Sequence, residues 1–440
     1  MDGDRRIQPC FLFLQGMATP FLGRLGVALF RRGYAVRRIN FNAGDKLFWP
    51  LPGAVDYRGD LDGWPAFLDA RVRDWGVTDI VAFGDCRPLH RVAARVAARR
   101  GVTLHIAEEG YLRPNWITLA PGGVNGNSAL PHDPDWYRRE ARLLPPWQPA
   151  TPVVSRFWRR AVGDVAYQVV TLLGSWYFPC YRTHLAWSPF REYAGWIGRF
   201  ARAPFRQRRD RSALLAMWRW KAAYPCFLFP LQLESDSQIR FHAPYPRLAP
   251  ALDRVFQSFA RFAPASARLI VKEHPLDPGL VDWHRETAAA ASRHGIADRV
   301  VYVRGSRIEK ILAGDVGVVT INSTVGFLAL AASVPTIALG KAIYDLPGLT
   351  FQNGIDRFWT EAAPPDAEIF DAFRRVVADR TQINGGFFSP SGLDRAVAGA
   401  LARLEQAVSV RDTMVPLPRA AIQPRDAAAP APAADLALSL

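Results

Sequence analysis

Two adjacent carboxylates are the first residues in this sequence whose type and spacing suit catalysis. Glu108 and Glu109 stand directly before Gly110. A carboxylate can act as a nucleophile or as a general acid or base, and glycine allows the chain to turn sharply after it. Neighbouring side chains of an extended segment point in opposite directions, so we expect only one of the two to face a substrate. Acidic residues are also common in surface loops, so the pair alone does not establish a catalytic site.

Two later segments are suited to holding a phosphate. The first is Lys272-Glu273-His274-Pro275, whose histidine can donate a hydrogen bond to a phosphate oxygen or protonate it. The second is Asn322-Ser323-Thr324, which precedes an apolar helical pattern. A Ser or Thr cap leaves free N–H groups at the positive end of the helix dipole. Each signal is weak alone, since loop histidines and capped helices occur in many proteins without such a role.

The segments that must position these residues alternate between strand and helix patterns. Strands are predicted at 10–14, 34–41, 79–83 and 103–107, and helices at 21–32, 64–75 and 88–100. This alternation is typical of a parallel sheet, whose ligands bind beyond the carboxyl ends of the strands. The loops that follow these strands and a later glycine-flanked loop therefore supply further candidates, namely Gln15, Gly16, Asn42, Asp85 and Asn125.

A second alternating block follows from about residue 224. Strands are predicted at 227–233, 268–272, 300–303, 316–321 and 336–339, with helices between them. The acid pair thus follows a strand of the first block, and both phosphate-type segments follow strands of the second. We expect two Rossmann-like α/β domains in a GT-B-like arrangement, with boundaries at 1–140, 141–222 and 223–415. The Ala/Pro-rich residues 416–440 are predicted to form a disordered tail.

The positive charge is concentrated between the two blocks. The chain has a formal net charge of +15, and residues 151–220 contain twelve arginines and three acidic residues, about +9 of that total. Tryptophans alternate with these arginines, which suits a surface lying on anionic lipid headgroups and equally suits a helical insert that packs its aromatic rings on the core. Because no stacking platform or recognition helix accompanies the charge, nucleic acid is not expected as a partner.

Cysteine and acid spacings give no sign of a metal site. The four cysteines lie far apart without a Cys-x-x-Cys spacing, and the sequence has no Asp-x-Asp pair at the predicted sites. We therefore expect a protein that needs no metal or cofactor. The sequence also shows no pattern typical of a signal peptide or a membrane-spanning segment, so we expect it to be cytoplasmic.

Several of these segments together resemble a known family. Glu108-Glu109-Gly110-Tyr111-Leu112-Arg113-Pro114 and Phe83-Gly84-Asp85-Cys86-Arg87-Pro88 are the most specific. With residues 13–16, 38–45, 122–126, 232–240 and 340–344, they are similar to the capsule polysaccharide β-Kdo transferases of the KpsS/KpsC type, and most closely to the KpsS branch. The similarity covers about residues 10–355.

This resemblance implies roles for individual residues. Glu109 matches the second acid of the family motif and would be the nucleophile of a retaining transfer, with Glu108 as the alternative. His274 would contact or protonate the phosphate of the CMP donor. Lys272, Pro275, Asn322, Ser323 and Thr324 would complete the donor site, and Arg113 would pair with the carboxylate of the sugar. The acceptor side would be formed by Gln15, Gly16, Asn42, Asp85, Asn125 and Gln238.

The same resemblance implies substrates and a place of action. The donor would be CMP-β-Kdo and the acceptor lysophosphatidylglycerol, so that the enzyme starts the β-Kdo linker of a capsular polysaccharide at the inner face of the inner membrane. A KpsC-type transferase and the capsule export complex would be partners. Two alternatives stay open: an inverting, sialyltransferase-like CMP-sugar transferase with Glu109 as base, and a non-catalytic export or assembly factor.

Overall fold

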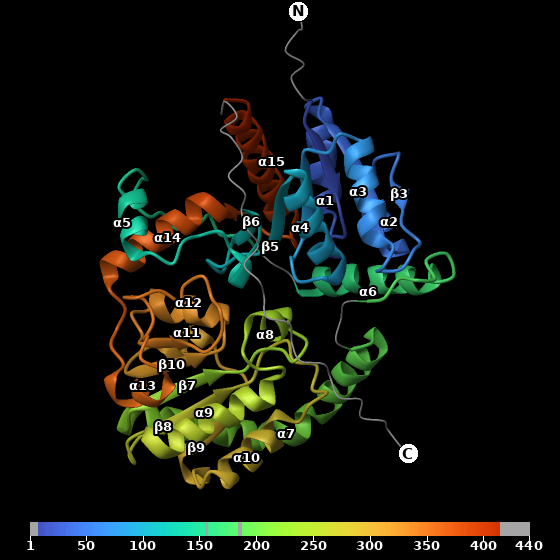
Figure 1. The fold of residues 1–440 in the computed structure, drawn as a ribbon. Helices are drawn as coiled ribbons and strands as arrows, with labels where there is room; N and C mark the ends of the chain where they lie inside the picture. The colour runs from blue at the N-terminus through green and yellow to red at the C-terminus, as the bar shows by residue number, and fades with distance from the viewer. Residues whose placement is uncertain (1–7, 155–156, 184–186, 414–440) are drawn as a thin grey trace, which may run out of the picture. The chain divides into compact units, whose positions relative to one another are not determined.

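Two separate β-sheets organise the chain (Figure 1). The computed structural model describes residues 8–154, 157–183 and 187–413. The first sheet has the strand order β12-β6-β5-β4-β1-β2-β3, and the second has the order β11-β10-β7-β8-β9. Both lie within the compact unit Met1–Leu401, and a second unit, Ala402–Leu440, follows it.

Nine of the strands in the described residues lie close to those predicted, whereas β3, β6 and β12 were not predicted. The first sheet contains β1 (Cys10–Phe13), β2 (Ala35–Asn40), β3 (Val55–Asp56), β4 (Asp79–Phe83), β5 (Thr103–Glu109), β6 (Trp116–Pro121) and β12 (Gln382–Asn384). The second contains β7 (Cys226–Pro230), β8 (Arg268–Lys272), β9 (Val300–Val303), β10 (Val316–Thr320) and β11 (Thr336–Ala338). The central strands β1, β4, β7 and β10 are buried along their whole length, as expected for a sheet covered on both faces.

Strand pairing confirms the two parallel α/β blocks. In the first sheet β3, β2, β1, β4 and β5 pair in parallel, and at one edge β6 is reversed, pairing antiparallel with both β5 and β12. All four pairings of the second sheet are parallel. The predicted GT-B-like architecture of two Rossmann-like halves is therefore confirmed.

Helices connect the strands within each block. They are α1 (Phe21–Arg31), α2 (Ala43–Leu47), α3 (Trp64–Asp74), α4 (Pro88–Arg100) and α5 (Pro134–Ala141) before the insert, and α8 (Ser237–His242), α9 (Leu248–Phe262), α10 (Trp283–Arg293), α11 (Ile308–Leu312), α12 (Thr324–Ala331), α13 (Ile355–Glu361), α14 (Ala367–Thr381) and α15 (Pro390–Thr413) after it. Short 3₁₀ helices lie at η1 (Asn125–Asn127) and η2 (Ala297–Arg299). Helix α1 shows the common principle, since Leu22, Leu25 and Leu29 lie on one buried face at helical spacing.

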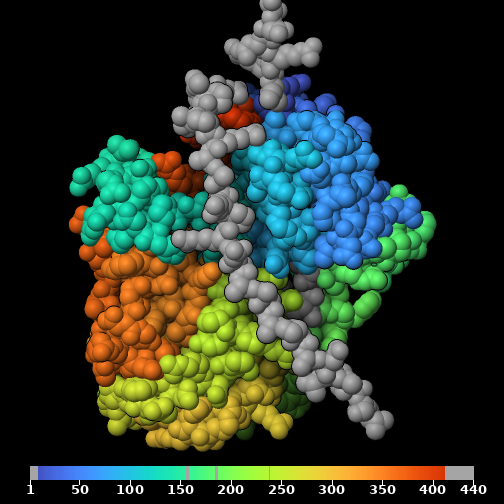
Figure 2. All heavy atoms as spheres, viewed as in Figure 1, coloured from blue at the N-terminus to red at the C-terminus, as the bar shows by residue number. Residues whose placement is uncertain are grey.

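The end of the chain returns to the first sheet, which the predicted boundary at 223–415 did not anticipate. Strand β12 pairs with β6, and α14 packs against α5, as their touching surfaces in Figure 2 show. Phe373 of α14 meets Tyr137 of α5 with ring centroids 5.1 Å apart. The apolar face of α14 finds its partners there and belongs to the first core. A strand of three residues leaves too little pattern in a sequence to reveal this return.

The predicted insert is helical. It consists of α6 (Phe157–Leu173) and α7 (Pro189–Ala223), and α6 lies against α2 (Figure 1). Many of its apolar side chains are exposed, including Trp158, Leu173 and Trp176. None of the helices in the described ranges combines the length and apolar character needed to cross a bilayer. The predicted tail at 416–440 lies outside the described residues.

Candidate active site

A cavity of about 590 Å³ brings together residues from both α/β halves and from the insert. The carboxyl ends of β4 and β5 contribute one wall, while the segments that follow β7, β8 and β10 contribute the other. Ten of the residues predicted from the sequence line this cavity: Asp85, Glu108, Glu109, Arg113, Asn125, Gln238, His274, Asn322, Ser323 and Thr324. The candidate site therefore lies at the strand ends, where parallel sheets bind their ligands.

Both acids of the pair reach the cavity. We expected only one of them to do so, and this expectation is wrong. Glu108 and Glu109 are the last two residues of β5, and the cavity extends around the end of this strand. Gly110 follows in a crowded position, where a Cβ atom would lie 2.3 Å from the carbonyl oxygen of Trp116.

Glu109 is held by two arginines. Its Oε1 lies 2.7 Å from Nη1 of Arg160, and its Oε2 lies 2.9 Å from Nη2 of Arg113. Burial alone would raise the pKa of this carboxyl, but the two guanidinium groups outweigh burial and hold its pKa below the usual range. Glu109 is therefore an ionised carboxylate at neutral pH. Arg113, predicted to bind the sugar carboxylate, already has a carboxylate partner.

Glu108 has the opposite protonation behaviour. Burial, followed by the negative charges of Asp85 and Asp236, raises its pKa to about 8, and the Glu109 carboxylate adds to this shift. Its Oε2 accepts a hydrogen bond of 2.9 Å from Nδ2 of Asn125. Two adjacent carboxyls thus differ in charge at neutral pH, an arrangement in which one can carry a proton while the other carries negative charge.

The ring of His274 is oriented by its own loop. The backbone N–H of Leu276 donates to Nδ1 over 3.1 Å, so in the neutral ring Nε2 carries the proton. Burial, and then the positive charges of Arg113 and Lys272, lower the pKa of His274 to about 4. At neutral pH this histidine is uncharged, so it is suited to donating a hydrogen bond to a phosphate oxygen rather than to protonating it.

The start of α12 completes the wall opposite the acids. Ser323 is the N-cap, and its Oγ accepts from the N–H of Val325 over 3.2 Å. Asn322 is fixed from both sides, because its Oδ1 accepts from Gln232 at 3.0 Å and its Nδ2 donates to the carbonyl of Gln238 at 2.9 Å. The Oε1 atom of Gln238 is buried and has no hydrogen-bond partner within the described chain. This wall combines a helix N-terminus with an unsatisfied acceptor.

A buried trio beside the acids has atom types that could bind a metal. Ligand atoms of Asp85, Cys86 and His242 lie within 4.8 Å of one another, and Sγ of Cys86 is 3.1 Å from Nε2 of His242. Burial, and then the charge of Asp85, raise the pKa of the thiol, so the cysteine stays protonated. Asp85 accepts hydrogen bonds of 3.0 Å from the N–H of Val124 and from Asn127. The contacts support a hydrogen-bonded cluster joining the two halves.

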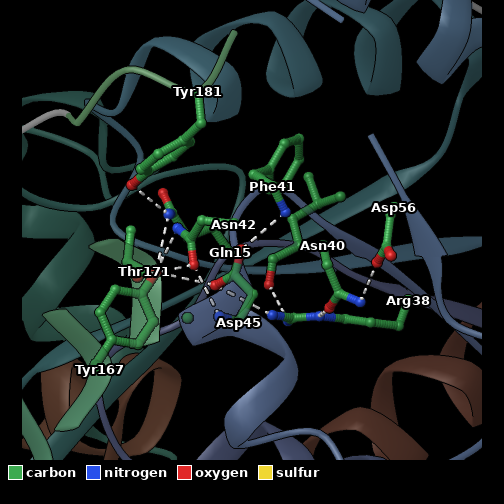
Figure 3. A network of polar contacts seen from close by, with 12 residues as sticks. Gln15, Arg38, Asn40, Phe41, Asn42, Asp45, Asp56, Tyr167, Thr171 and Tyr181 are labelled. Carbon is green, nitrogen blue, oxygen red and sulfur yellow. Dashed lines mark hydrogen bonds and ion pairs between the residues drawn. The ribbon is translucent and has the colours of Figure 1, made fainter. Parts of the chain in front are cut away.

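Gln15, Gly16 and Asn42 do not line the cavity. Gln15 donates to the hydroxyls of Tyr167 at 3.1 Å and Tyr181 at 2.9 Å, and Asn42 donates to Tyr167 at 2.8 Å (Figure 3). These groups surround the buried ion pair of Arg38 and Asp45 and fix α6 against the first sheet. The backbone carbonyl of Gly16 accepts from Arg87. The two amides satisfy buried tyrosines of the insert, so they are occupied before any acceptor binds.

Lys272 and Pro275 also lie outside the cavity lining. Lys272 is buried, with its Nζ 3.4 Å from the carbonyl oxygen of Glu273, and Pro275 faces solvent. Glu273 is the residue of this motif with the most contacts, because its carboxylate accepts from Tyr302 and pairs with Arg304 and, at 2.7 Å, with Arg199 of α7. The motif therefore anchors the insert on one side and presents only His274 to the cavity.

Sequence reasoning missed several cavity residues. Arg160 was counted among the basic residues of the insert, yet it reaches Glu109. Asp236 caps α8 through Gln238 and lines the cavity, where burial raises its pKa. Arg240 also lines it. From the segment 232–240 only Gln238 was given a role, and the charged residues Asp236 and Arg240 were the signal that could have drawn attention to the rest.

A family model and relatives of known sequence indicate one family. The model of the family described as "Capsule polysaccharide biosynthesis protein" matches residues 78–388. The chain is 34% identical over 383 residues to the capsule polysaccharide modification protein LipB of Neisseria meningitidis serogroup B, covering 86% of this chain and 91% of LipB. It is 33% identical over 382 residues to the capsule polysaccharide export protein KpsS of Escherichia coli, covering 86% and 96%. The structure titled KpsC, β Kdo 2,7 transferase, from Thermosulfurimonas dismutans aligns with a TM-score of 0.40 at 13% identity, covering 90% of this chain and 99% of that one.

Proposed function

Because this chain belongs to the family of capsule polysaccharide biosynthesis proteins, we propose that it is a retaining β-Kdo glycosyltransferase. It takes Kdo from CMP-β-Kdo and transfers it to lysophosphatidylglycerol to begin the linker of a capsular polysaccharide. One observation carries the proposal: an ionised and a protonated carboxyl lie side by side in a cavity whose opposite wall is suited to a phosphate.

The donor phosphate lies against the second half of the protein. The N-terminus of α12, capped by Ser323, and the Nε2–H of His274 both face an anion there. The carboxylate of Kdo pairs with Arg113, which releases one oxygen of Glu109 while Arg160 retains the other. The leaving group is a nucleotide monophosphate, so these donors offset its charge and the transfer requires no metal.

Transfer then proceeds in two displacements, as in retaining glycosidases. In the first, Glu109 forms a bond to the anomeric carbon, the bond from that carbon to the CMP phosphate oxygen breaks, and Glu108 gives its proton to the departing phosphate. Esterification removes the negative charge of Glu109, which lowers the pKa of Glu108. In the second, Glu108 accepts the proton of the acceptor hydroxyl as that oxygen displaces Glu109, which restores both carboxyls.

The acceptor reaches this cavity from a lipid surface. Exposed apolar side chains stand among the arginines of the insert: Trp158 and Leu173 on α6, Trp176 in the turn that follows it, and Phe205 on α7. Such a combination suits a protein that lies in the headgroup region of an anionic membrane. We place the enzyme peripherally on the inner face of the inner membrane, where a KpsC-type transferase and the capsule export complex act on its product.

A direct assay tests the proposal. Purified protein is incubated with CMP-Kdo generated in situ and a lysophosphatidylglycerol analogue, and the products are analysed by mass spectrometry. We expect a Kdo-lipid with the wild-type chain, a covalent Kdo adduct on Glu109, and no product with Glu109→Ala. Folded protein without product would favour a non-catalytic export factor. Product of inverted configuration, without an adduct, would favour a sialyltransferase-like enzyme in which Glu109 acts as base.

A further inference from the structure

A second large cavity lies between the insert and the second α/β half. Its volume is about 510 Å³, and the residues that line it are all different from those of the cavity with Glu108. One side is the α7 segment from Ala194 to Arg206, and the other is the loop 279–282 together with Arg304. No residue given a role in the transfer lines this cavity, so we call it the α7 pocket.

Positive charge dominates the α7 pocket. Arg202, Arg206 and Arg304 line it, against the single carboxylate of Asp282. Arg304 pairs with Glu273, whereas no hydrogen bond or ion pair joins Arg202 or Arg206 to another group within the described residues. Burial, and then repulsion from Arg304, lower the pKa of Arg206 although Asp282 opposes this. The pocket therefore holds three guanidinium groups against one carboxylate, and two of the three form no ion pair within the described residues.

The other lining residues indicate the size and type of ligand. Gly198 and Gly279 leave space beside the backbone, since a Cβ atom would meet nothing nearer than Arg202 at 3.6 Å or Arg199 at 3.7 Å. Gly195 instead allows the loop to approach α7 closely, because its Cβ atom would lie 2.8 Å from the carbonyl oxygen of Pro278. No aromatic ring is among the lining residues in the described chain, so the pocket offers nothing on which a nucleotide base would stack. Arginine pairs with phosphate oxygens through parallel hydrogen bonds, which favours a compact phosphate.

Apolar side chains beside the pocket indicate where that phosphate comes from. Phe205 precedes Arg206, and its side chain is 88% exposed. Phe190 and Ile197 are 66% and 70% exposed, and they lie on the same side of α7 as Phe205 because the spacings are seven and eight residues. Exposed rings next to unpaired arginines are typical of a helix that lies in a lipid interface.

We propose that the α7 pocket binds the phosphate of an anionic phospholipid headgroup and so docks the protein on the membrane beside its reaction cavity. Arg202 and Arg206 hold the phosphate, while Phe190, Ile197 and Phe205 enter the acyl region. This inference rests on the membrane association in the proposed function, and it assigns that association to a defined site rather than to diffuse charge.

Vesicle sedimentation tests the site. The protein is mixed with vesicles of phosphatidylcholine alone or of equal parts phosphatidylcholine and phosphatidylglycerol. Arg202→Gln/Arg206→Gln should bind the mixed vesicles about 150-fold more weakly, from about 1.5 kcal/mol for each hydrogen bond to a charged phosphate that is lost. The control Arg208→Gln/Arg211→Gln makes the same change of charge on exposed residues of α7 outside the pocket. It should lose about 30-fold at most, from about 1 kcal/mol per arginine near an anionic surface, and less at higher salt because that attraction is screened. Equal losses in both would overturn the proposal.

A variant without a change of charge separates the pocket from the surface. Gly198→Leu places a side chain in the pocket, is compatible with a helix, and should weaken binding to the mixed vesicles about tenfold. Unchanged or stronger binding would show that the surface alone drives association. If inorganic phosphate binds the wild type and not Arg202→Gln/Arg206→Gln while all variants bind vesicles equally, the pocket takes a free anion and the lipid proposal fails. If the wild-type protein bound neither kind of vesicle, the membrane association itself would be refuted. Kdo transfer to a detergent-dispersed acceptor tests the catalytic proposal independently of membrane binding.

Discussion

Replacing Glu108 with glutamine should stabilise the protein, and increasingly so as the pH rises. Glu108 has a pKa of about 8 in the folded protein, against an ordinary value of 4.5 in the unfolded chain. Between these values the folded state binds more protons than the unfolded state, so the free energy of unfolding of the wild type falls as the pH rises. The glutamine of Glu108→Gln is uncharged at every pH, so the free energy of unfolding of this variant does not fall in the same way.

The magnitude follows from the width of that interval. It spans about 3.5 pH units at 1.36 kcal/mol each, a ceiling of about 5 kcal/mol. Glu108 is only half-buried and is therefore screened by solvent, so we expect about 2 to 3 kcal/mol at pH 8 and little difference at pH 4.5. Urea unfolding of both proteins at several pH values measures it.

Glu109→Gln is the matched control with the opposite sign. The pKa of Glu109 is lowered, so its stabilising effect is present above the unfolded value of 4.5 and is lost as the pH falls through its folded pKa. The glutamine variant also leaves Arg113 and Arg160 without their carboxylate partner. It should be less stable than the wild type at pH 8, with a gap that narrows on acidification. If Glu108→Gln gained no stability between pH 4.5 and pH 8, our assignment of a protonated Glu108 would be refuted.

Two further variants test the catalytic wall and the attachment of the insert. His274→Gln should keep most of the Kdo-transfer activity and His274→Ala should lose about tenfold or more, because a neutral N–H donor is needed rather than a proton; equal losses in kcat would contradict this role. Tyr167→Phe removes the hydroxyl that accepts from Gln15 and Asn42 and donates to Asp45, so it should lower the urea unfolding free energy by about 1 to 3 kcal/mol. The control is Tyr177→Phe, whose hydroxyl forms no hydrogen bond with that network in the described part of the chain; an equal loss there would show that the network is not the cause.

Local pattern was sufficient to predict nine of the twelve strands in the described residues and most of the helices between them, but not β3, β6 or β12. The predicted strands 79–83, 268–272 and 300–303 have the bounds found in the structure. Buried parallel strands are short apolar runs bounded by polar loops, so the signal lies within each run. The position of a residue just after a predicted strand is also a local feature of the sequence. Because parallel sheets bind ligands at their strand ends, it was enough to select Glu108, His274 and Ser323, which all line the cavity.

Long-range contacts decided what the sequence could not. Gln15 and Asn42 occupy the same type of loop as Asp85. Both donate hydrogen bonds to Tyr167 of α6, however, and neither lines the cavity. The return of β12 to the first sheet depends on a pairing between residues far apart in the chain.

The sequence by itself determined the two α/β blocks, the acid pair and the basic insert. Only the tertiary structure decided which carboxyl is charged. Glu108 and Glu109 are identical residues at adjacent positions, and their protonation differs because Arg113 and Arg160 reach Glu109 while burial, Asp85 and Asp236 act on Glu108. A pKa depends on the charges and the solvent around a group, and both depend on which distant segments fold against it.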